Sequence, residues 1–379
     1  MRAHKLFSVL LSTLLLMACL PLTAISVSAA QSGTTGDCRW TLDDNGHLTI
    51  FGRGKMGNYG HVNNGNGELV LNRPWGQNVT SVTIMDGVTA IGERAFYYCK
   101  PLKWITIPNS VKTIGYGAFL GCDSLVSITV DEHNDNFRSV DGVLFNKDKT
   151  TLIRYPAANN ATYTIPNSVK TIDAYAFYGC ESIRSVTMPD SITTIGEYAF
   201  SYCDNMTDIT ISNNVTSIEL FTFTGCTSLQ AVTIPDSVKT IRSWAFSECR
   251  ALSSVSIGNG IETIEGYVFS MCDAITDVYY DNEQNRHTIE MNEAGNEDLL
   301  GAQWHYKYVS TTTLAPTTTT SVTCEPTIFT TTTIIKNTSV PQSDNDPNNI
   351  TIVIYIITLL SVIVVIVLFF VLIKKKTSK

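Results

Sequence analysis

A repeat of 23 residues constrains this chain more than any other feature. A cysteine returns at one place in each copy. Five of the six gaps between these cysteines are 23 residues long, and the sixth is 58, which is one repeat plus an insert of 35. Because one such copy cannot bury its apolar face alone, the copies must stack into a solenoid. The cysteines that mark the repeat are Cys99, Cys122, Cys180, Cys203, Cys226, Cys249 and Cys272.

Each copy predicts a short strand followed by a turn. Ile105-Thr106-Ile107 alternates apolar and polar residues, which places two side chains in a core and one outside. Pro108 ends this strand because proline cannot donate to a ladder. Val111 and Ile114 return to the core, as a second short strand, and Ala118-Phe119 then opens a helical or 3₁₀ turn. One phenylalanine per copy should stack in a buried spine, made of Phe96, Phe119, Phe177, Phe200, Phe223, Phe246 and Phe269.

The frame I-P-x-S-V-x-x-I-x-x-x-A-F-x-x-C resembles the BspA-like class of leucine-rich repeats, from about Cys38 to Tyr308. The resemblance implies a repeat solenoid on a cell surface. Members of this class look like adhesins that bind host matrix proteins or neighbouring cells. The expected partner is therefore a host extracellular-matrix or cell-surface protein or glycan. The class has no catalytic residues to carry over, and its binding residues do not map to fixed motif positions.

Both ends of the chain indicate a membrane protein. Residues 1–30 read as a secretory signal peptide, with a basic start, an apolar centre and small residues before Gln31. Leu16–Cys19 leaves open an alternative, a lipoprotein cleavage box. Residues 350–373 carry no charge and would span ~36 Å as a helix. Three lysines follow, so residues 374–379 should form a cytoplasmic tail and the body should be extracellular.

The remaining segments divide by composition. Residues 31–78 predict a β cap, with a hairpin around Asp43–Gly46, and residues 79–280 hold the repeats. Residues 131–161 read as a lengthened repeat with a hairpin around Asn146–Thr150, or alternatively as a binding loop. Residues 281–308 should cap the far end, and the threonine-rich residues 309–349 should form a stalk.

Little in the sequence favours an enzyme. Without the six basic residues near the two ends, the body carries 20 basic and 34 acidic residues, which disfavours nucleic-acid binding. Gly52–Gly57 matches G-x-G-x-x-G, but a polar glycine-rich segment follows it where a dinucleotide site needs a helix. Asp131–Asn136 fits a calcium loop poorly, and a solvated turn is expected. No cofactor or metal is predicted, and the in-phase cysteines are expected as buried thiols.

The outward residues of the strands are the candidate binding face. Period-2 alternation places one column of hydroxyl side chains between the buried positions and a second column beside it. Two interpretations stay open: threonine as an ordinary exposed strand residue, or a surface on which aromatic side chains anchor a partner. The corresponding functions are an adhesin or binding module and a structural surface spacer without a specific ligand. The candidate residues are Trp104, Thr106, Thr129, Thr187, Asp208, Thr210, Thr233, Asp277 and Tyr279.

Overall fold

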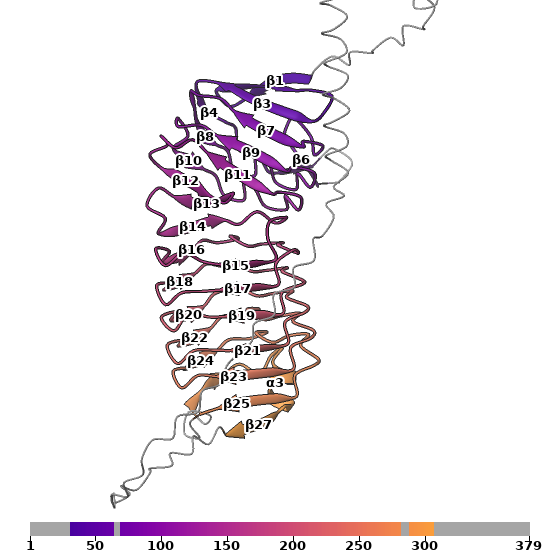
Figure 1. Cartoon of the computed structure of the whole chain (residues 1–379). Coiled ribbons are helices and arrows are strands. Elements are labelled where there is room, and N and C mark those ends of the chain that lie inside the picture. The colour runs from indigo at the N-terminus through magenta and orange to yellow at the C-terminus, as the bar shows by residue number, and fades with distance from the viewer. Residues whose placement is uncertain (1–30, 64–68, 282–287, 307–379) are drawn as a thin grey trace, which may run out of the picture. The chain divides into compact units, whose positions relative to one another are not determined.

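The structure is a computed structural model that describes residues 31–63, 69–281 and 288–306. These residues form a solenoid of about ten turns at a spacing of about 23 residues, with two rows of short strands stacked along one axis (Figure 1). The expected signal peptide, stalk, membrane helix and cytoplasmic tail lie outside the described residues. No helix within the described ranges has the length and apolarity that a membrane span needs.

The first row holds the nine expected strands, and neighbours within each sheet run parallel in a register that repeats the sequence period. Thr83 pairs with Thr106, and the registers of the next strand pair shift by the same 23 residues. Ile105 and Ile107 point inward while Trp104 and Thr106 point outward, so the predicted alternation is confirmed. The strands are β7 (Ser81–Ile84), β9 (Trp104–Ile107), β11 (Ser127–Val130), β15 (Thr162–Thr164), β17 (Ser185–Thr187), β19 (Asp208–Thr210), β21 (Ala231–Thr233), β23 (Ser254–Ile257) and β25 (Asp277–Tyr280).

The second row consists of very short strands at the return of each repeat to the core. Most of them form where the sequence reads Thr-Ile or, in β20, Ser-Ile, and the isoleucine is buried in most copies. This confirms the second strand expected after Val111. Its members are β4 (Gly54–Lys55), β8 (Val88–Ile91), β10 (Thr113–Ile114), β16 (Thr171–Ile172), β18 (Thr194–Ile195), β20 (Ser217–Ile218), β22 (Thr240–Ile241) and β24 (Thr263–Ile264).

Each repeat closes in consecutive turns, and the expected helical or 3₁₀ turn is wrong. The Cys99 N–H donates to the Phe96 carbonyl at 3.0 Å, the bond of a single tight turn. Within that turn Tyr98 has φ of +54°, and Arg94, two residues before the turn, has φ of +50°. A left-handed residue breaks a right-handed helix, so these turns cannot join into one.

The aromatic spine forms as expected and has two more members. All seven phenylalanines are buried, and rings within each half of the stack lie 4.7–6.1 Å apart. Trp75 stacks on Phe96 and extends the spine toward the N-terminus. Tyr155, from the insert, stacks on Phe177 at 4.9 Å with its ring fully buried. The insert thus supplies one turn of the solenoid, with tyrosine in the place of phenylalanine.

The insert also divides the core. Its strands are β12 (Phe137–Val140), β13 (Val143–Asn146) and β14 (Thr151–Arg154), and the expected hairpin joins the last two. Three consecutive residues of β13 are buried. Leu144 packs with the N-terminal hydrophobic cluster, whereas Val143 and Phe145 pack with the C-terminal one. The strand is therefore buried on both sides, as a partition across the interior.

Both ends of the stack are closed. At the N-terminal end, β1 (Gln31–Thr35), β2 (Cys38–Leu42) and β3 (His47–Gly52) are antiparallel, and β3 then pairs in parallel with β7. The expected hairpin turns on Asp43, whose carboxylate accepts the His47 N–H at 2.8 Å. A small antiparallel pair, β5 (His61–Asn63) and β6 (Leu69–Leu71), branches from this end.

The C-terminal end is closed by β26 (Glu290–Met291), α3 (Glu297–Gly301) and β27 (Gln303–Tyr306). The strand β27 adds to β25 in parallel. Asn296 is fully buried, and its side-chain oxygen accepts the Phe269 N–H at 3.0 Å. One turn earlier, the equivalent N–H of Phe246 donates to a backbone carbonyl of the following turn. Phe269 has no following turn of the repeat, so without Asn296 its N–H would lack this partner. One amide side chain thus completes the last turn.

Candidate functional site

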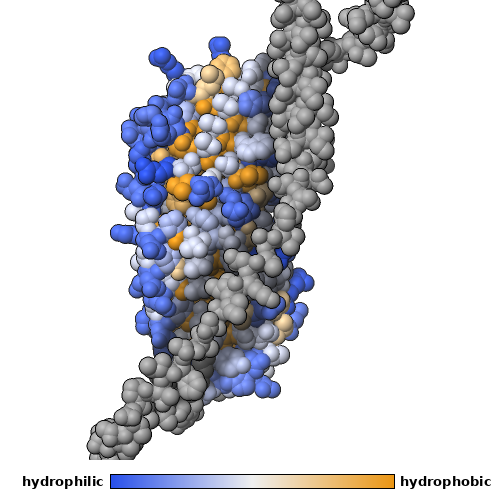
Figure 2. Space-filling view, in the orientation of Figure 1, coloured by the Kyte–Doolittle hydropathy of each residue, from blue (hydrophilic) through white to orange (hydrophobic). Residues whose placement is uncertain are grey.

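The strand face is a weakly polar surface with one prominent aromatic residue. Trp104 is 53% exposed, and the Lys103 ammonium lies 5.7 Å from the centre of its ring. Figure 2 shows pale and apolar residues interspersed on the visible face, with strongly hydrophilic residues mainly along its left margin. An exposed tryptophan on a flat hydroxyl surface is the kind of residue that dominates interface energies. The other predicted residues that are exposed here are Thr106, Thr129, Thr187, Asp208, Thr210 and Thr233.

The C-terminal end of this face is partly covered. The Tyr279 ring stacks on the His305 ring of β27 at 5.1 Å, so it is half-buried and not the exposed anchor that was expected. The Asp277 carboxylate accepts from Thr276 at 2.7 Å and contacts His305 Nε2 at 2.7 Å. These hydrogen bonds lower the pKa of Asp277. Both residues are therefore engaged within the chain by the last strand.

The face is not one continuous column, which corrects the expectation from the repeat. Beside β11, the turn at Asp141–Gly142 replaces a strand, and the Gly142 carbonyl accepts the Ile128 N–H at 2.9 Å. Gly142 has φ of +80°, and an added Cβ would lie 2.9 Å from Ser127 Oγ, so the close approach requires glycine. The hydroxyl positions on either side of this turn belong to different sheets.

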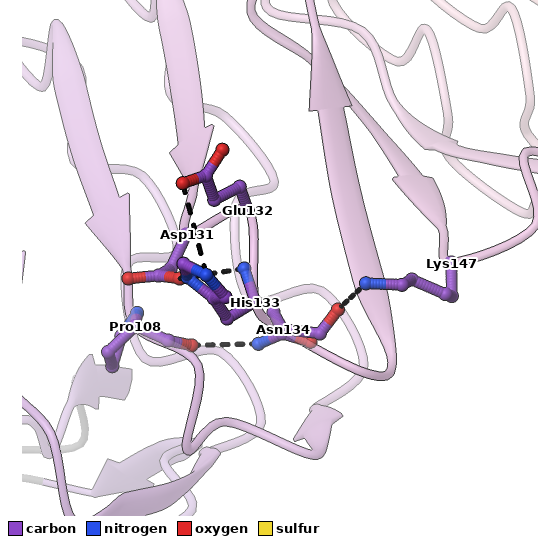
Figure 3. Close-up of polar contacts among 6 residues, drawn as sticks. All are labelled: Pro108, Asp131, Glu132, His133, Asn134 and Lys147. Carbon is purple, nitrogen blue, oxygen red and sulfur yellow. Dashed lines mark hydrogen bonds and ion pairs between the residues drawn. The ribbon is translucent and has the colours of Figure 1, made fainter.

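The acidic loop after β11 is built around a buried amide (Figure 3). Asn134 is fully buried and donates from Nδ2 to the Pro108 carbonyl at 2.7 Å. Its side-chain oxygen accepts the N–H groups of Asn136 and Phe137 at 2.8 and 2.9 Å. That oxygen is committed to the loop itself, and not to a cation. Among the described residues, no three or more His, Cys, Asp and Glu side chains are grouped to hold a metal ion.

The cysteines form a buried ladder and not a reactive site. All eight described cysteines are free and buried, and Cys203 Sγ donates to the carbonyl of Phe177, one turn earlier, at 3.2 Å. Burial raises the pKa of the Cys99 thiol to about 11 and that of Cys180 to about 12. A nucleophilic cysteine needs the opposite shift. The expectation of buried thiols is confirmed for these residues, while Cys19 and Cys324 lie outside the described ranges.

The sequence did not predict a second row of aromatic residues. This row runs along the turn edge, which is the side of the stack formed by the turns that carry the spine residues. Its rings are nearly coplanar, 3–9° from parallel, with centres 4.5–6.0 Å apart. Each of its residues lies two positions before a spine phenylalanine and has φ between +57° and +64°. The aromatic residue that recurs two positions before the spine phenylalanine is the sequence signal that could have predicted this row. The row consists of Tyr175, Tyr198, Phe221, Trp244 and Tyr267.

A family model for the BspA type leucine-rich repeat region matches the chain in six copies, at residues 75–163 and 154–276. The two ranges together span more than half of the 379 residues. The chain belongs to the BspA-type leucine-rich repeat family. The matched range contains the seven spine phenylalanines, the seven in-phase cysteines and most strands of both rows, so the BspA-type repeat is the unit of this fold. A search of curated proteins gave no match.

Solved bacterial repeat proteins are similar to this BspA-type chain. A leucine-rich repeat protein from Eubacterium ventriosum is 24% identical, with 65% of this chain and 90% of that one covered and a TM-score of 0.42. A leucine rich cell surface protein from Faecalibacterium prausnitzii is 23% identical, with 69% and 97% covered and a TM-score of 0.45. The pneumococcal vaccine antigen PcpA is 17% identical, with 74% and 99% covered and a TM-score of 0.47.

Proposed function

We propose that this BspA-type chain is a membrane-anchored cell-surface binding protein, an adhesin that contacts a protein or glycan on a host or neighbouring cell through its strand face. The observation that carries the proposal is Trp104, a large aromatic side chain left 53% exposed on a surface of short hydroxyl side chains. Large exposed aromatic side chains of this kind are enriched among the residues that dominate interface energies.

The capped ends support the same role. An open solenoid end would offer free strand edges and apolar surface to any other chain. Here Asn296 and β27 close one end, and the antiparallel β1–β3 closes the other. The strand face is thus left as the regular surface on which a partner can lie along several turns. The apolar residues 350–373 and the stalk before them would hold this surface away from a membrane.

The alternative function is a structural spacer without a specific ligand. The hydroxyl columns alone favour it, because threonine is a good exposed strand residue whatever the role. The two proposals differ in whether the unmodified chain adheres to a specific partner at all, and the strand-face proposal adds that Trp104 controls that adhesion.

The experiment compares Trp104→Ala with Tyr116→Ala in the full-length chain displayed on cells. The two aromatic residues are matched in exposure, at 53% and 52%, but Tyr116 lies on the turn edge. We expect Trp104→Ala to reduce adhesion to matrix-coated surfaces about tenfold or more, as loss of an interface hot spot does, and Tyr116→Ala to leave it unchanged. Full adhesion by Trp104→Ala would reject the strand face, and no adhesion by the unmodified chain would favour the spacer.

A further inference from the structure

The turn edge of the solenoid has one seam, where the turn of Phe119 meets the turn of Tyr155. Elsewhere in the repeats, spine residues that have a following turn donate their N–H to it: Phe96 donates to the Ala118 carbonyl at 2.9 Å, and Phe200 to the Thr222 carbonyl at 2.8 Å. At the end of the stack, Phe269 donates to the Asn296 side chain instead. The N–H groups of Phe119 and Gly117 have no partner among the described residues. In other turns, the equivalent N–H groups point toward the following turn. The N–H groups of Phe119 and Gly117 therefore face the seam.

A buried arginine lies on the opposite side of the seam. Arg154 is 4% exposed, and its two terminal nitrogens donate to the carbonyls of Tyr175 and Tyr178 at 2.7 and 3.0 Å. Its Nε is buried without a partner. No carboxylate in the described part of the chain pairs with the guanidinium. A buried cation without a counter-charge is costly, and the cost falls when an anion reaches it.

A cavity of about 140 Å³ occupies the seam between these donors. Phe119, Gly117 and Arg154 all line it. Tyr116 also lines it and is 52% exposed, so the cavity reaches the surface beside this ring. One water fills roughly 30 Å³, so the space suits a group the size of acetate or sulfate.

Asp173 is the one acidic side chain on the cavity wall. Its carboxylate accepts the Ala174 N–H at 2.9 Å, which turns that oxygen toward its own backbone. Asp173 is exposed, and partial desolvation raises the pKa of its carboxyl. The unpaired groups of Phe119, Gly117 and Arg154, the residues that line this cavity, are all N–H donors.

We propose that the seam binds a small oxyanion, either free or carried as the carboxylate of an acidic sugar, with the N–H groups of Phe119 and Gly117 and the Nε of Arg154 as its donors. Convergent backbone N–H groups and a guanidinium are the donors that anions meet in proteins. The site lies on the turn edge, so it stands whether or not the strand face binds a partner.

Isothermal titration of the full-length chain tests the site with sodium sulfate, sodium acetate and sodium glucuronate, against glucose as the neutral control. We expect the anions to bind and glucose not to bind. Glucuronate that binds about tenfold more tightly than acetate would identify an acidic sugar as the ligand, and equal affinities would identify a free oxyanion. Absence of binding by all three anions overturns the proposal, because water then satisfies the donors.

Two variants locate the site. Arg154→Gln removes the charge and should weaken anion binding at least about tenfold, the usual effect of losing a charged hydrogen bond. Because that variant also loses the caps on two carbonyls, Ala174→Leu provides a second test. Ala174 lines the cavity, and Leu220 occupies the same repeat position two turns further on, so leucine fits the backbone and fills the space.

Ser243→Leu is the matched control, at the same repeat position but away from the seam. It should bind the anions as the unmodified chain does, and so should Trp104→Ala. Anion affinity that is unchanged in folded Ala174→Leu would place binding elsewhere and overturn the proposal.

Discussion

Phe200 illustrates how much stability one spine residue contributes. It is fully buried, with ring centres 4.7 Å from Phe177 and 5.4 Å from Phe223. Neighbouring turns are held by their own ladders and cannot collapse into the gap, so Phe200→Ala should lower the free energy of unfolding by about 3–5 kcal/mol. Urea denaturation measures this loss. Thr210→Ala, on the strand face, should change it by less than about 0.5 kcal/mol.

The buried thiols make stability depend on pH. Burial raises the pKa of Cys180 to about 12, above the 9.0 of an exposed thiol. The folded state therefore favours the neutral thiol. This contribution is fully present below pH 9.0, and it is lost as the pH rises from there toward about 12. The denaturation midpoint should fall over this range, and less steeply in Cys180→Ala.

The same ladder should be unreactive in the native protein. A thiol reagent at pH 8 should label Cys180 and Cys203 only after denaturation, because the thiolate is the reactive form and both side chains are fully buried. Disulfides between successive turns, found by mass spectrometry of the native chain, would contradict this prediction.

At the scale of the structural element, the turn-edge aromatic row balances strain against stacking. Tyr198 has φ of +57°, yet its ring lies 4.8 Å from Tyr175 and 4.7 Å from Phe221. Removing the ring loses the stacking in any variant, but only glycine also relieves the backbone. Tyr198→Ala should therefore be less stable than Tyr198→Gly by about 1 kcal/mol.

Thermal unfolding of the two variants measures that difference. Tyr116 provides the control, because it is exposed and outside the left-handed set. There the order should reverse, with alanine more stable than glycine, since glycine loses more backbone entropy on folding. Equal stability of Tyr198→Ala and Tyr198→Gly would show that the left-handed conformation carries no cost at this position.

At the scale of the whole molecule, Asn296 determines whether the stack ends cleanly. Its side chain accepts the Phe269 N–H and donates to the Glu265 carbonyl at 2.8 Å. Asn296→Ala should reduce stability by about 1–3 kcal/mol through unpaired buried groups. It should also promote self-association, visible by light scattering. Asn205→Ala, which loses one exposed hydrogen bond to Glu181, should do neither.

The repeat period predicted most of this architecture, because in-phase Ile and Phe residues can be buried in only one way. The strands, the spine and both hairpins follow from that phase. Tyr155 was not predicted as a spine member, since no A-F-x-x-C frame surrounds it and only stacking on Phe177 reveals its place. His305 covers Tyr279 because β27 pairs with β25. The sequence around residue 305 does not predict that pairing.

The turn-edge features were the least predictable part. Aromatic residues disfavour φ above zero, so local propensity argues against the conformation that Tyr198 and Trp244 adopt. Their mutual stacking, which no single copy contains, offsets that preference. The sequence did not predict the seam either. It shows an insert of 35 residues, but it does not show that the Phe119 N–H lacks a backbone acceptor in the next turn.

The partition at β13 has a mechanical consequence. The two hydrophobic clusters meet at this strand, and across the adjoining seam Phe119 makes none of the backbone bonds that tie other turns together. If the molecule is pulled by its two ends, tension is the same in every turn, so rupture begins where the fewest bonds resist it. Single-molecule extension should therefore show two force peaks, one for each cluster, with the first separation between Phe119 and Tyr155.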